Sequence, residues 1–137
     1  PLLRDFLNPR VAMTPVYPGV DPAIIDHLAA THAGVVVEGY GAGHIPTDDP
    51  SPVSAIRSAT ARGVPVVVCT RCLLGSTEME RYQIGRAALD AGAIPAMDMT
   101  PEAAHVKLMW VLGQTTDMKT VESLILKSFA GELREHL

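Results

Sequence analysis

The chain has 137 residues, a length typical of one domain, with 47% hydrophobic and 19% charged residues. This proportion excludes a disordered chain, and the formal net charge of −4, without a basic run, argues against nucleic acid or an anionic membrane surface as a partner. No stretch approaches the ~20 apolar residues that span a bilayer and no signal peptide is seen, so we expect one soluble, cytoplasmic domain.

Apolar, β-branched runs at residues 11–17, 35–40, 66–70 and 94–97 predict four strands. The valines at 35–37 and 66–68 are continuous rather than alternating. Such runs are typical of strands buried on both faces of a parallel sheet.

Helical spacing separates these runs, and three helices are predicted to begin where a capping residue precedes proline, at Asp21-Pro22, Ser51-Pro52 and Thr100-Pro101. Glycines expected after helices are Gly34, Gly63 and Gly92. The expected buried positions are Ile24, Ile25 and Leu28; Val53, Ile56 and Ala59; Ala104, Leu108, Val111 and Leu112. A last helix, capped by Thr116 or Asp117, is predicted to bury Val121, Leu124, Ile125 and Ser128.

This alternation of strands and helices predicts an α/β fold, with a small, open, mostly parallel sheet of about four strands and helices on both faces. We find no internal repeat and no linker. Residues 1–137 are therefore expected to form a single domain.

Two loops follow strands at the edge of the sheet where ligands bind in open α/β folds. The first, residues 38–46, carries glycine at 39, 41 and 43 and ends near His44. Such a run lets the backbone approach a ligand, but it lacks the spacing of a dinucleotide site, and a tight loop without a ligand is the alternative. The second loop spans residues 69–78.

The second loop contains the pair Cys69 and Cys72. Zinc needs four ligands and no second pair is present, and the pair does not follow the first strand as in a thioredoxin-like unit, so we interpret the spacing as coincidental. Neither a metalloprotease nor a serine-hydrolase motif occurs, and we predict no catalytic residue and no metal in this chain. The chain begins with Pro1, and an N-terminal proline can serve as the catalytic base of a tautomerase, so a tautomerase remains an alternative.

Eight motifs in order resemble the C-terminal domain of L-asparaginases. Those of the first half are Tyr17-Pro18-Gly19, Glu38-Gly39-Tyr40-Gly41-Ala42-Gly43-His44-Ile45-Pro46 and Thr70-Arg71-Cys72-Leu73-Leu74-Gly75. The others are Tyr82-Gln83-Ile84-Gly85, Ala91-Gly92-Ala93-Ile94-Pro95, Asp98-Met99-Thr100-Pro101-Glu102-Ala103, Lys107-Leu108-Met109-Trp110 and Ala130-Gly131-Glu132-Leu133. The similarity is greatest to the cytoplasmic (type I) branch and to the asparaginase-like subunit of archaeal glutamyl-tRNA(Gln) amidotransferase.

The resemblance implies a two-domain amidohydrolase that converts L-asparagine to L-aspartate and ammonia through an acyl-threonine, without metal or cofactor. Its threonine nucleophile lies in an N-terminal domain that this chain lacks. The resemblance also implies that the C-terminal domain takes part in a homodimer and carries a glycine-rich loop that reaches the partner's active site. The family usually has an asparagine at one position of that loop, and His44 aligns with it in this chain.

The substrate-binding residues implied by the resemblance are His44, Gly43, Gly41, Tyr40 and Glu78, with Arg71 as a shaping residue. The small-molecule substrate, L-asparagine or L-glutamine, stays open. Two other interpretations also remain: a non-catalytic amino-acid-binding or regulatory module, and a component of a tRNA-dependent amidotransferase.

Overall fold

The computed structural model describes residues 4–40, 45–70 and 85–134. These residues form a four-stranded sheet of β1 (Val11–Pro15), β2 (Gly34–Gly39), β3 (Val66–Thr70) and β4 (Ile94–Pro95). The strands lie in the order β1-β2-β3-β4, and every pair is parallel. The predicted parallel sheet of four strands is confirmed.

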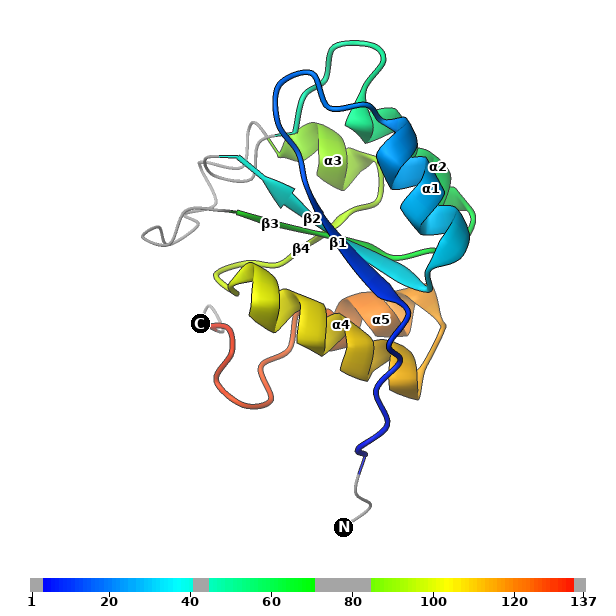
Figure 1. The fold of residues 1–137 in the computed structure, drawn as a ribbon. Helices are drawn as coiled ribbons and strands as arrows, with labels where there is room; N and C mark the ends of the chain where they lie inside the picture. The colour runs from blue at the N-terminus through cyan, green and yellow to red at the C-terminus, as the bar shows by residue number, and fades with distance from the viewer. Residues whose placement is uncertain (1–3, 41–44, 71–84, 135–137) are drawn as a thin grey trace.

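The helices form two layers around this sheet (Figure 1). One layer holds the crossover helices α1 (Ala23–Thr31), α2 (Pro52–Ala61) and α3 (Arg86–Asp90), and the other holds α4 (Pro101–Gln114) and α5 (Met118–Ile125). Because the strand order never reverses, right-handed crossovers place α1, α2 and α3 on the same face. The opposite face is then left for α4 and α5, and the prediction of helices on both faces is confirmed.

The valine runs supply both hydrophobic cores. Val35 and Val37 pack toward the crossover helices, Val36 packs toward α4 and α5, and all three are fully buried. Alternate side chains of a strand point to opposite faces, so a strand covered on both sides must be apolar throughout. This confirms the reason for expecting continuous rather than alternating runs.

The predicted capping residues lie at the helix starts. Ser51 Oγ accepts a hydrogen bond from the N–H of Val53 at 3.1 Å, and Thr100 Oγ1 accepts one from the N–H of Ala103 at 3.1 Å. Of the two candidates for α5, Asp117 is the cap, and its hydrogen bonds from Thr120 lower the pKa of its carboxyl. Asp21 accepts from the N–H of Ala23, where α1 begins, one residue later than predicted.

Several boundaries and one glycine differ from the prediction. Gly63 and Gly92 have the expected left-handed backbone, with φ of +80° and +100°, but Gly34 is the first residue of β2. A Cβ on Gly34 would lie 2.8 Å from Leu112 Cδ1, so this glycine admits α4 to the sheet rather than ending a helix. Ile24 is 38% exposed, and only its neighbour Ile25 enters the core.

Three of the predicted elements end earlier in the structure than the sequence suggested. β1 ends at Pro15 because the chain turns there, with Val20 N–H donating to Tyr17 O, and β4 has only two residues. α5 ends at Ile125, so Ser128 lies outside it. The carboxylate of Glu132 accepts the N–H groups of Phe129 and Ala130, which commits this backbone to a turn.

Candidate functional site

The two predicted ligand loops leave the sheet from neighbouring positions. Gly39 at the end of β2 is the register partner of Thr70 at the end of β3, and Glu38 is the partner of Cys69. Cys69 Sγ lies 3.6 Å from Val37 O, to which it donates, and this buried contact joins the two strands near their carboxyl ends. The parallel register therefore brings the origins of both loops to one point at the carboxyl edge of the sheet.

The glycine-rich loop has a fixed residue on each side. Tyr40 is half-buried and packs against the core beneath the crossover helices. Ile45, on the other side, is only 1% exposed, and Ser51 Oγ donates to Pro46 O at 2.8 Å. The chain between Tyr40 and Ile45 thus starts and ends at the packed body of the domain.

Of the predicted substrate-binding residues, the structure describes Tyr40. Gly41, Gly43, His44 and Glu78 lie outside the described residues, as do Arg71 and Cys72. The substrate-binding roles of these residues therefore stay predictions. The structure shows that the strands before the two loops are neighbours, with Gly39 opposite Thr70.

Residues 4–40, 45–70 and 85–134 contain no group of three or more histidine, cysteine or acidic side chains placed to hold a metal ion. Within the same ranges no helix is long and apolar enough to cross a membrane. Cys69, at the end of β3, is buried.

A second arrangement, which the sequence analysis did not predict, centres on Lys107 of α4. This lysine is 7% exposed, and its Nζ lies 2.6 Å from Glu132 Oε1. It also donates to Lys127 O and lies 5.6 Å from the centre of the Phe129 ring. One ammonium group therefore holds residues 127–132 against the helix.

The surroundings of Glu132 stabilise the charged form of its carboxyl group. Burial alone would raise its pKa, but hydrogen bonds from Lys107 and from the backbone N–H groups of Ala130, Glu132 and Phe129 outweigh burial and lower the pKa to about 2. The carboxylate is consequently ionised throughout the physiological range. Lys107 and Glu132 both occur in motifs of the sequence resemblance. The sequence feature that could have pointed to this ion pair is a lysine next to the buried positions of α4.

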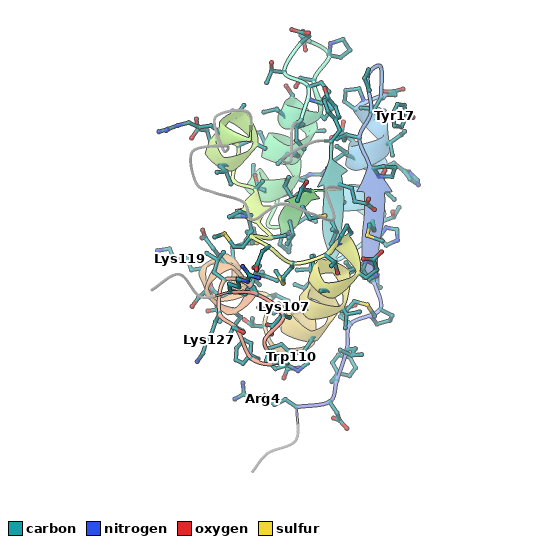
Figure 2. The ribbon with its side chains drawn as sticks, turned by 90° about the vertical axis from the view of Figure 1, so that its left-hand side faces the viewer. Arg4, Tyr17, Lys107, Trp110, Lys119 and Lys127 are labelled. Atoms are coloured by element: carbon teal, nitrogen blue, oxygen red, sulfur yellow. The ribbon has the colours of Figure 1, made fainter. Side chains whose placement is uncertain are left out.

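Residues 4–8 cross the outer side of the same helix. Trp110 Nε1 donates to Arg4 O at 2.8 Å, Gln114 Nε2 donates to Phe6 O at 3.1 Å, and Asn8 N–H donates to Met109 O at 2.9 Å. Figure 2 shows Arg4, Trp110, Lys107 and Lys127 on this side of the molecule, far from Tyr17. Helix α4 thus holds two segments that are remote in sequence.

Comparisons with known proteins match this chain in sequence and in fold. The glutaminase/asparaginase C-terminal domain family matches residues 10–125. An L-asparaginase of Thermococcus kodakarensis is 42% identical over 97% of this chain and 40% of its own length. A glutamyl-tRNA(Gln) amidotransferase subunit from Methanothermobacter thermautotrophicus is 45% identical over 97% of this chain and 30% of its own length.

Solved structures give the same result. The thermostable L-asparaginase of Thermococcus kodakarensis superposes with a TM-score of 0.88 and 40% identity, over 96% of this chain and 40% of that one. L-asparaginase I of Vibrio cholerae superposes with a TM-score of 0.82 and 31% identity, over 94% of this chain and 39% of that one. The chain spans less than half the length of each of these relatives.

Proposed function

Because this chain belongs to the glutaminase/asparaginase C-terminal domain family, we propose that it acts as the C-terminal domain of a two-domain L-asparaginase-like amidohydrolase. The observation that carries the proposal is the agreement in sequence and backbone with an L-asparaginase over nearly the whole chain. The reaction is hydrolysis of the side-chain amide of L-asparagine to L-aspartate and ammonia.

In this proposal the two domains divide the chemistry. A threonine of the N-terminal domain attacks the amide carbon, ammonia leaves, and water releases L-aspartate from the acyl-enzyme. An oxyanion hole for this step is built from the same domain. The present chain contributes binding, and neither a metal nor a cofactor takes part.

The glycine-rich loop is the proposed substrate contact. Glycine at 41 and 43 lets the main chain approach an α-amino, α-carboxylate ligand, and His44 hydrogen-bonds near its ammonium group. Tyr40, packed against the core, supports the start of this loop, and Glu78 of the neighbouring loop gives a second polar contact. The common origin of the loops at Gly39 and Thr70 supports this grouping.

The proposal includes a homo-oligomer in the cytoplasm. The loop would serve the active site of a second copy, so that a complete site needs residues of two protomers. The two cysteines of the sequence are too few for a disulfide framework, which suits a reducing compartment.

A second candidate function is that of the amidotransferase component, since relatives with that name reach the same identity as the L-asparaginase. Such a component would act on an amide donor only as part of a tRNA-dependent complex. The acidic composition of this chain favours tRNA contact through other parts of the complex.

One experiment separates these functions. The polypeptide that contains this sequence is purified as its cell makes it, its intact mass is measured, and ammonia release is followed from L-asparagine and from L-glutamine, with and without glutamyl-tRNA and co-purifying proteins. We expect a mass well above 14.6 kDa and release from free L-asparagine. Release only with the tRNA and a partner supports the amidotransferase, and a 14.6-kDa protein without activity would contradict both proposals.

A further inference from the structure

A groove of about 340 Å³ lies on the outward side of α4. Its walls come from the segment 4–8, from α4 and from the segment 127–132. Leu7, Val106 and Phe129 line it and are 41%, 55% and 49% exposed. Phe6, next to Leu7, is 65% exposed. Three of the eight large, exposed apolar side chains of the described residues therefore line one groove, which marks an interaction surface.

The polar groups of the groove are satisfied within the domain. Lys107 is bound to Glu132 and Lys127 O, and the carboxylate of Glu132 accepts hydrogen bonds from Lys107 and from backbone N–H groups of its own segment. The indole N–H of Trp110 donates to Arg4 O. An amino acid or another small polar ligand would have to break these bonds to be recognised, whereas an apolar protein surface would not. The chemistry of the groove thus fits a protein partner with apolar side chains.

We propose that this groove is the docking surface for the catalytic domain of the same polypeptide, an inference that rests on the proposed function. Leu7 belongs to the segment that three hydrogen bonds hold across α4, so the polypeptide preceding it is delivered to this face. The relatives exceed twice the length of this chain, which leaves a second domain to be placed. A tethered domain meets the groove at a high effective concentration, which favours it over a separate protein.

Photochemical cross-linking in the full polypeptide tests this. Val106→p-benzoylphenylalanine places the probe in the groove at a half-exposed position that tolerates it, and Ile24→p-benzoylphenylalanine on α1 is the control on the other layer. The protein is irradiated as an equal mixture of light and heavy-isotope forms, and linked peptides are identified by mass spectrometry. Expected from Val106 are links to peptides of the catalytic domain without mixed isotopes, and far fewer such links from Ile24.

Three results would overturn the proposal: mixed-isotope links, which mean that a second copy covers the groove; links to another protein; or equal yields from Val106 and Ile24. Val106→Asp gives an independent measurement, because a charge in the interface should speed proteolytic cleavage between the domains severalfold, and Ile24→Asp should not. L-asparaginase activity is measured on the same samples. Activity without same-chain links refutes the docking alone, and a long polypeptide without activity refutes the function while leaving the docking measurable.

Discussion

The ammonium group of Lys107 and the carboxylate of Glu132 lie 2.6 Å apart at the base of the segment that follows α5. Lys107 is the one lysine or arginine that the described residues bury. Its charge is compensated by Glu132, by Lys127 O and by the face of the Phe129 ring. This pair helps to hold residues 127–132 on α4, and with them one wall of the groove.

Replacement of the lysine should release this segment. Lys107→Met leaves Glu132 largely buried without its cation, and we expect a loss of stability on the order of 2–3 kcal/mol, below the range for fully buried pairs because Glu132 keeps some solvent contact. Urea denaturation measures it. The control Lys119→Met, at an exposed position of α5, should cost less than about 0.5 kcal/mol, and equal losses for the two variants would contradict the assignment.

The same pair predicts a pH dependence. The folded-state pKa of Glu132 is about 2, below its ordinary 4.5, so folding favours the ionised carboxylate. Its stabilising contribution is complete above the ordinary pKa and disappears as the pH falls toward the folded-state value. Glu132→Gln should therefore lower the melting temperature at neutral pH, with a difference from the parent that shrinks between about pH 5 and pH 2. Glu122→Gln, exposed on α5, should show no such trend.

Gly113 permits the segment 4–8 to cross α4. A Cβ at this position would overlap the carbonyl oxygen of Phe6. Alanine is otherwise favoured over glycine inside a helix by about 1 kcal/mol, so Gly113→Ala should displace the segment while the helix persists. Hydrogen exchange at the Asn8 amide, which donates to Met109 O, should accelerate. After removal of residues 1–7, Gly113→Ala should leave the free energy of unfolding unchanged or raise it. A variant that is still destabilised without these residues would refute this explanation.

Gly34 controls the distance between α4 and the sheet. The added methyl of Gly34→Ala would meet Leu112 Cδ1 at 2.8 Å and Leu108 Cδ2 at 3.0 Å, both in the core. We expect a destabilisation of about 1–3 kcal/mol, typical of overpacking. Leu112→Ala alone leaves a cavity, but combined with Gly34→Ala it gives room to the new methyl. The double variant should lose less stability than the sum of the single losses, and additive losses would exclude a direct clash.

Substitution of His44 tests the proposed substrate contact in the full polypeptide. Removal of a hydrogen bond to a charged ligand costs about 1.5–3 kcal/mol, so His44→Ala should raise KM for L-asparagine roughly ten- to hundredfold. His27→Ala on the exposed side of α1 is the matched control and should leave KM unchanged. An unaltered KM in His44→Ala would remove this residue from the site.

The parts of the candidate site that depend on local sequence patterns could be predicted. The two loops follow apolar strand runs, and parallel strands end at the same edge, so the common origin at Gly39 and Thr70 follows from the fold class. Tyr40 was expected at this edge and lies there. The groove on α4 was not predictable, because residues 7, 106 and 129 come from three distant parts of the chain.

The sequence alone determined the elements of this domain. Valine runs specify strands buried on both faces, and Ser51 and Thr100 before proline specify helix starts, because these signals act on the backbone of the residues that carry them. The tertiary structure decided what depends on close approach. It made Gly34 a packing position beneath α4 and joined Lys107 to Glu132, since only the assembled layers bring these groups within contact and remove them from water.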